Sequence, residues 1–102
     1  MLESLDITTF AGRLGDVFLL VPDETTVIVT RLIAVTPAPG GSAGQVRAGG
    51  RTPFSLVLRS PPSAPLPQRI YRLQHEELGP LDLFLVPIGP DDVGMCYEAV
   101  FS

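Results

Sequence analysis

The chain has 102 residues, which is the length of one small domain, and we expect a single domain over residues 1–102. Its hydrophobic content of 45% against 18% charged residues excludes an intrinsically disordered chain, and no apolar run approaches the 18 residues of a membrane-spanning helix. The net charge of −4 disfavours nucleic acid as a partner, and a single cysteine excludes an internal disulfide.

The N-terminal region contains the one segment with a helical pattern. Thr8 or Thr9 can cap a short helix, in which Phe10 and Leu14 are spaced to share one face and Gly15 ends the helix. At under two turns, such a helix needs packing against the rest of the domain.

Two strands are predicted next, over residues 16–21 and 25–36. The first is continuously apolar from Val17 to Val21 and is expected to stop at Pro22. The second is apolar on both faces apart from Arg31, which is typical of a strand that is central or that bends between two layers. Residues 37–52 are rich in Gly, Pro, Ser and Ala and are predicted to form a long loop.

Four further strands are predicted over residues 54–59, 69–74, 81–88 and 95–101. In the strand over residues 81–88, alternation places Leu81, Leu83 and Leu85 on one face. Gly79, in the turn before this strand, is expected to have a left-handed conformation. Short turns join the last three strands, so they are predicted to form an antiparallel meander. No strand–helix–strand unit is present. The sequence therefore predicts a mainly β fold: a small antiparallel β-barrel or sandwich of about six strands with one short N-terminal helix.

No set of residues matches a known catalytic constellation. Residues 40–44 fit the pattern G-x-S-x-G, but the helix and the downstream acid that a serine hydrolase requires are missing. All seven basic residues are arginine, so lysine chemistry is excluded. His75 and Cys96 are too few ligands for a zinc site. We expect no enzyme activity, no cofactor and no metal.

The remaining candidates are binding residues. The leading hypothesis is an assembly module that binds another protein, or itself, through a sheet edge or a loop. The alternative is a small-ligand-binding barrel in which Arg31, Arg59 or Arg72 anchors an anion. Tyr71 and His75 complete the candidate set. A minor third hypothesis is an enzyme whose site is shared between subunits. The N-terminus lacks a signal-peptide pattern, so a cytoplasmic location is expected.

Several segments together resemble a family of small bacterial proteins that is classed only as a domain of unknown function. The segments that carry the resemblance are Pro53–Arg59, Leu66–Gly79, Leu83–Gly89 and Tyr97–Phe101, with Phe10–Gly15 near the N-terminus. This chain has Glu76 where the family commonly has proline after the histidine. The resemblance implies no known activity and no catalytic residues. It also implies an association with phage-tail-collar-like proteins, and the Tyr71-x-Leu73-x-His75 turn is similar to small β-barrels of phage minor tail proteins.

Overall fold

A computed structural model describes residues 5–37 and 53–101 of the chain. Strands dominate it, and one short helix precedes them. In chain order the elements are α1 (Ile7–Ala11), β1 (Val17–Asp23), β2 (Thr26–Pro37), β3 (Phe54–Ser60), β4 (Arg69–His75), β5 (Gly79–Pro90) and β6 (Met95–Phe101).

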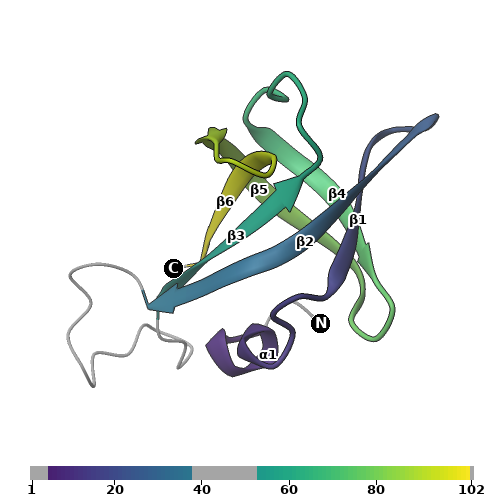
Figure 1. Ribbon diagram of the computed structural model, residues 1–102. Helices are drawn as coiled ribbons and strands as arrows, with labels where there is room; N and C mark the ends of the chain where they lie inside the picture. Colours follow the sequence, from purple (N-terminus) through teal and green to yellow (C-terminus); the bar gives the residue numbers. More distant parts are fainter. Residues whose placement is uncertain (1–4, 38–52, 102) are drawn as a thin grey trace.

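The six strands form one closed antiparallel barrel (Figure 1). The strand order is β1-β2-β3-β6-β5-β4, and β4 pairs with β1 to close it. This confirms the predicted mainly β fold and selects the barrel over the sandwich. The predicted meander of the last three strands is also confirmed, since β4 pairs with β5 and β5 with β6.

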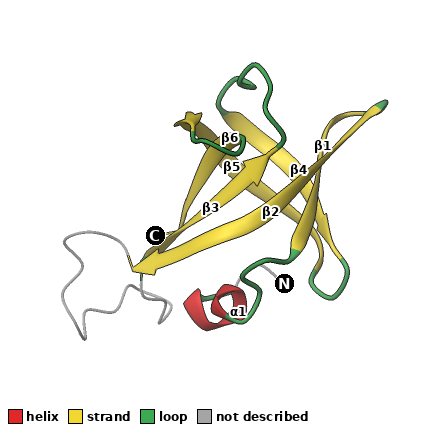
Figure 2. Ribbon diagram, in the orientation of Figure 1, coloured by secondary structure: helices red, strands yellow, loops and turns green. Residues whose placement is uncertain are grey.

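The barrel consists of two meanders with the same plan, β1-β2-β3 and β4-β5-β6 (Figure 2). Each has strands of seven, twelve and seven residues. In each meander the long middle strand pairs with the preceding strand along its first part and with the following strand along its second part. The second pairing contains a register shift in both, between Leu32 and Ala34 and between Pro87 and Gly89. Such bulges bend a strand, which lets β2 and β5 turn the corners of the barrel.

Side chains fill the barrel interior. The alternation expected for β5 is observed, since Leu81, Leu83 and Leu85 are buried. A group of aromatic rings occupies the end nearest α1, where Phe10 packs against the rings of Phe18, Phe54 and Phe101. The helix thus closes one end of the barrel, while the β3–β4 loop lies at the other end (Figure 2).

The predicted start and end of the helix are wrong. Its N-cap is Asp6 rather than Thr8 or Thr9: the Asp6 carboxylate accepts the backbone N–H of Thr9, and the Thr9 hydroxyl accepts the backbone N–H of Asp6. This reciprocal capping satisfies two otherwise unpaired donors. The helix ends at Ala11, so Leu14 lies beyond it and is 54% exposed rather than packed beside Phe10.

The predicted end of the first strand is also wrong. β1 continues through Pro22 to Asp23, because the proline lies at a register shift between Leu20 and Asp23, where no regular ladder bond is needed from its nitrogen. The φ of Gly79 is 77°, which confirms its predicted left-handed conformation. Residues 38–52, which include most of the predicted loop and the G-x-S-x-G match, lie outside the described residues. Within the described ranges, no helix has the length and apolar character needed to cross a bilayer.

Candidate functional site

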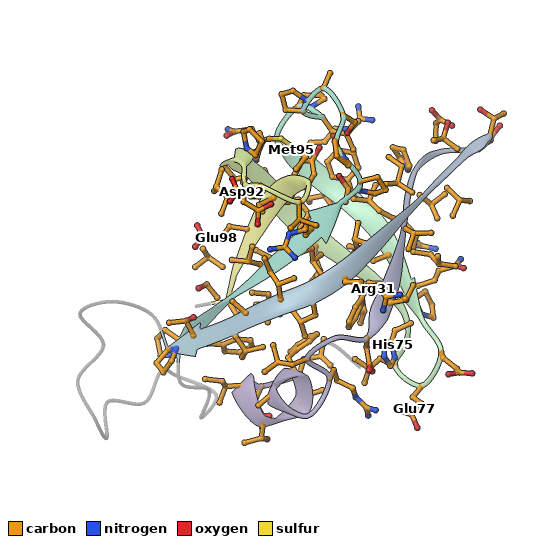
Figure 3. The ribbon with its side chains drawn as sticks, in the orientation of Figure 1. Arg31, His75, Glu77, Asp92, Met95 and Glu98 are labelled. Atoms are coloured by element: carbon orange, nitrogen blue, oxygen red, sulfur yellow. The ribbon has the colours of Figure 1, made fainter. Side chains whose placement is uncertain are left out.

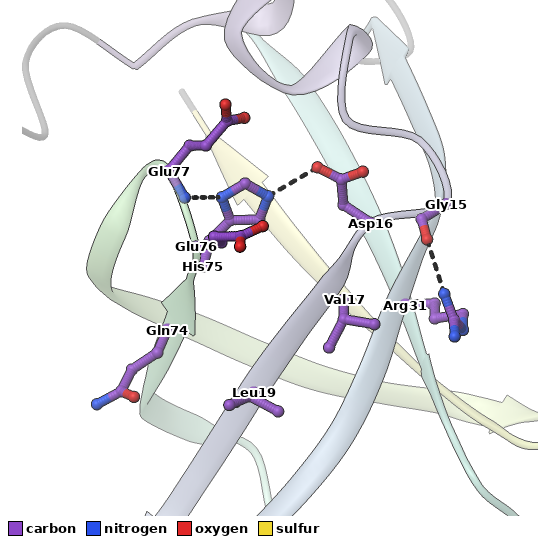
Figure 4. Close-up of a pocket in the computed structure, with 9 residues that line it drawn as sticks. All are labelled: Gly15, Asp16, Val17, Leu19, Arg31, Gln74, His75, Glu76 and Glu77. Atoms are coloured by element: carbon purple, nitrogen blue, oxygen red, sulfur yellow. Dashed lines mark hydrogen bonds and ion pairs between the residues drawn. The ribbon is translucent and has the colours of Figure 1, made fainter.

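An open pocket of about 720 Å³ lies on the flank of the barrel, where the start of β1 meets the turn between β4 and β5 (Figure 4). It contains two of the predicted binding residues, Arg31 and His75 (Figures 3 and 4). Its lining residues are Gly15, Asp16, Val17, Leu19, Arg31, Gln74, His75, Glu76 and Glu77.

His75 is buried at the wall of this pocket and both of its ring nitrogens are occupied. Nδ1 accepts the backbone N–H of Glu77 at 3.0 Å and that of Leu78 at 3.1 Å. Because backbone N–H groups only donate, the ring hydrogen is on Nε2, which donates to the Asp16 carboxylate at 2.7 Å. The Phe18 ring lies against the imidazole, with 4.6 Å between ring centroids. His75 therefore fixes the β4–β5 turn and ties it to the start of β1.

The Asp16–His75 pair resembles part of a catalytic triad but lacks the necessary open nitrogen. In a triad, the carboxylate orients one imidazole nitrogen while the other faces the nucleophile. Here the second nitrogen of His75 is held by two backbone amides. The pair can orient a turn, and its geometry provides no route for proton transfer from a nucleophile.

Arg31 lies on the outer face of β2 beside the pocket. One guanidinium nitrogen donates to the carbonyl of Gly15 at 3.0 Å. Among the described residues no carboxylate lies within ion-pair distance of Arg31. A smaller hollow of about 200 Å³ adjoins the same side chain and is lined by Val29, Arg31, Arg59, Ser60, Pro61 and Val93. Arg31 is thus the predicted anion anchor whose charge is most available to a partner.

The other two predicted anchors are neutralised by carboxylates of the same chain. Arg59 binds Asp91 through two nitrogens, with Nε 2.9 Å from Oδ2. Arg72 binds Asp82, its direct cross-strand neighbour on β5, with Nε 2.6 Å from Oδ1. Hydrogen bonding to the carboxylate raises the pKa of each guanidinium. The structure does not bring Arg72 to the pocket that contains Arg31.

Tyr71 belongs to the barrel core rather than to a binding surface. It is 2% exposed, and its hydroxyl donates to the carbonyl of Pro67. The guanidinium of Arg69 lies over its ring, 5.0 Å from the centroid. It lies on β4, where buried and exposed residues alternate from Tyr71 to His75.

Cys96 is buried beside the ion pair of Arg59 and Asp91. The residue is 6% exposed. Burial and the Asp91 carboxylate raise the pKa of its thiol, which disfavours the reactive thiolate. Across the described ranges, no three His, Cys, Asp or Glu side chains are grouped as metal ligands would be.

Sequence reasoning missed Asp16, because its partner His75 lies 59 residues further along the chain and no local pattern links them. It also missed that the first part of β2 exposes its apolar side chains, since strong apolar character in a strand normally indicates burial. The large apolar side chains that the described surface exposes are Leu14, Val27, Val29, Ile70, Phe84, Ile88, Val93 and Val100.

One family model, Domain of unknown function (DUF6916), matches residues 5–101. No match was found among curated proteins or among solved structures. The chain belongs to the DUF6916 family, which confirms the resemblance to a domain of unknown function, and the family's description names no activity.

Proposed function

We propose that this member of the DUF6916 family is a non-enzymatic assembly module that binds a protein partner through the outer surface of its barrel. The observation that carries the proposal is the contrast between a filled interior and an apolar exterior. Within the described residues, aromatic and leucine side chains occupy the interior, as expected for a barrel with too few strands to enclose a ligand. Large apolar side chains nevertheless remain on the outside.

Some of these exposed side chains are neighbours in the sheet. Ile70 and Phe84 are directly opposite each other on β4 and β5. Val29 is opposite the half-buried Leu19 on β1, and Val27, two residues before Val29, lies on the same face of β2. Grouped apolar side chains on an otherwise polar surface commonly mark a protein-binding site.

The polar groups support a binding role over a catalytic one. His75 has both nitrogens in structural hydrogen bonds, and Arg59 and Arg72 are paired within the chain. The sequence resemblance extends the proposal to phage-tail-like or surface protein assemblies.

Light scattering on the purified domain, together with co-purification with the products of neighbouring genes, tests the proposal. We expect either self-association or one stoichiometric partner, and replacing Phe84 with glutamate is expected to weaken any complex formed through β4 and β5. A domain that is monomeric and captures none of the neighbouring proteins would contradict the proposal.

A second candidate function is the binding of a small carboxylate or phosphate at Arg31. The observation that favours it is the hollow between Arg31 and Arg59, next to a guanidinium with no carboxylate partner in the described structure. Calorimetric titration with phosphate and with citrate tests it. Arg31→Gln should abolish binding and Arg69→Gln should preserve it. No binding by the wild-type domain, or equal loss in both variants, would contradict it.

A further inference from the structure

The first part of β2 has a strand neighbour on one side only. Its residues Thr26 to Ile28 and onward pair with β1, whereas the pairing between β2 and β3 begins at Arg31. Within the described structure, the backbone of residues 26–30 therefore has β1 on one side and no strand on the other. Figure 1 shows this end of the β1–β2 hairpin projecting from the rest of the barrel.

This free edge carries none of the features that normally protect one. Proteins blunt exposed edges with charged residues, proline or a bulge. Residues 26–30 read Thr-Val-Ile-Val-Thr, a sequence with high strand propensity and no charge. The corresponding part of β5 differs, because residues 79–85, which also lie outside the pairing with β6, contain Pro80 and Asp82. Of these two corresponding segments, only the one on β2 lacks both a charge and a proline.

The side chains beside the edge are also suited to contact. Val27 is 61% exposed and Val29 is 47% exposed, and both point to the outer face. A strand added along the edge would extend the sheet and place its own side chains against these valines, as in recognition by β-strand addition. Backbone hydrogen bonds would give affinity, and the neighbouring charges would select the partner.

The charges at the two ends of the edge are complementary to each other. The hairpin tip carries Asp23 and Glu24, and Arg31 lies at the other end of the edge, on the same face as Val27 and Val29. Among the described residues, neither Glu24 nor Arg31 has an ion-pair partner. A segment that runs antiparallel to this edge and carries the same charges in the same order would satisfy both ends at once.

Building on the proposed function, we propose that the occupant is a second copy of this chain, and that two β2 edges pair antiparallel across a two-fold axis near Val27. Val27 then faces Val27 of the other copy. The hairpin turn that precedes β2, with Glu24, then lies beside the part of β2 that leads to Arg31 of the other copy, so each Arg31 side chain extends toward an acidic tip. The contact is self-complementary, as a two-fold interface must be.

Sedimentation equilibrium of the full chain, from about 1 μM to about 1 mM, tests this pairing. We expect a reversible dimer. Val27→Lys places two like charges opposite each other at the axis and should weaken dimerisation at least about tenfold. Val100→Lys is the matched control. Val100 has a similar exposure of 64% but lies on β6, so this substitution should leave dimerisation unchanged. Circular dichroism and thermal midpoints show that each variant folds.

A charge exchange tests the register separately. Arg31→Glu should weaken the dimer by repulsion from the acidic tip, and adding Glu24→Arg should restore it. A wild-type chain that stays monomeric over the whole concentration range overturns the inference. A dimer that persists in Val27→Lys, or that Val100→Lys weakens equally, also overturns it. So does a charge exchange that fails to restore the dimer. A monomer that still co-purifies with a neighbouring gene product would leave the proposed assembly role in place, so the two failures are distinguishable.

Discussion

The hydrogen bonds of His75 decide most of what the candidate site can do. A sequence shows one histidine in a turn, and that residue type fits a ligand, a base or a structural element equally well. The structure gives it two backbone donors on Nδ1 and one carboxylate on Nε2, so the imidazole is committed to holding the turn. Residue identity alone could not give these partners, since Asp16 comes from a distant part of the chain.

Replacing His75 with alanine is expected to lower the free energy of unfolding by about 2–4 kcal/mol, because two backbone N–H groups lose their acceptor and a cavity forms beside Phe18. Urea denaturation measures the change. Gln74→Ala is the control, since Gln74 lines the same pocket but is exposed, and it should change stability by about 0.5 kcal/mol or less. Equal effects of the two substitutions would show that the His75 hydrogen bonds do not stabilise the turn.

The Asp91 carboxylate is bound both by Arg59 and by the backbone of the turn that follows it. The Arg59 guanidinium, followed by the backbone N–H groups of Gly94 and Val93, holds the pKa of the Asp91 carboxyl well below its usual value. A carboxyl whose pKa is lowered on folding stabilises the folded state above the pKa it has when unfolded. That contribution is lost as the pH falls through the folded pKa.

We therefore expect the stability of the wild-type domain to fall as the pH drops below about 4, and to fall less steeply in Asp91→Asn. The variant should be less stable than the wild type at neutral pH, and the difference should shrink in acid. Urea denaturation at a series of pH values measures this. Asp92→Asn is the control, because no hydrogen bond joins the Asp92 side chain to the described residues. Parallel pH profiles for wild type and Asp91→Asn would contradict the assignment.

At the level of elements, the β5–β6 hairpin depends on a close contact with the end of β3. Asp91 accepts the N–H groups of Val93 and Gly94 in the turn, and the backbone N–H of Asp91 donates to the carbonyl of Gly94. A Cβ on Gly94 would lie 1.9 Å from the carbonyl oxygen of Ser60, closer than any side chain allows. The glycine is required because the turn passes directly against the backbone of β3.

Gly94→Ala is expected to destabilise the domain by about 2–4 kcal/mol or to prevent folding, because backbone rather than a flexible side chain must move. Gly12→Ala, at the C-cap of α1, is the control: its Cβ would meet no atom within 4 Å, so stability should change by about 0.5 kcal/mol or less. Thermal denaturation compares the two variants. A tolerated Gly94→Ala would show that the hairpin can separate from β3 without cost.

At the scale of the whole molecule, closure of the barrel makes each strand depend on two neighbours. β1 joins the two meanders through three residue pairs with β4, and Phe10 of α1 packs inside the barrel. Neither meander therefore has a core of its own. Removing one strand or the helix would expose the common core.

Calorimetry should accordingly show one unfolding transition, with a calorimetric enthalpy equal to the van't Hoff enthalpy and near 60–80 kcal/mol, about the value for a domain of roughly 100 residues. Two transitions, or hydrogen exchange that opens one meander far more readily than the other, would show that the meanders are independent units. The same measurement tests the single domain expected from the length of the chain.

The sequence by itself determined the number of strands, the alternation of β5 and the left-handed Gly79, because periodicity and turn chemistry are local properties. Only the tertiary structure decided the closure of β4 on β1, the pairing of Asp16 with His75 and the exposure of Val27 and Val29. These depend on which distant segments become neighbours. An apolar strand has the same local pattern whether a neighbouring strand covers it or its edge is left open.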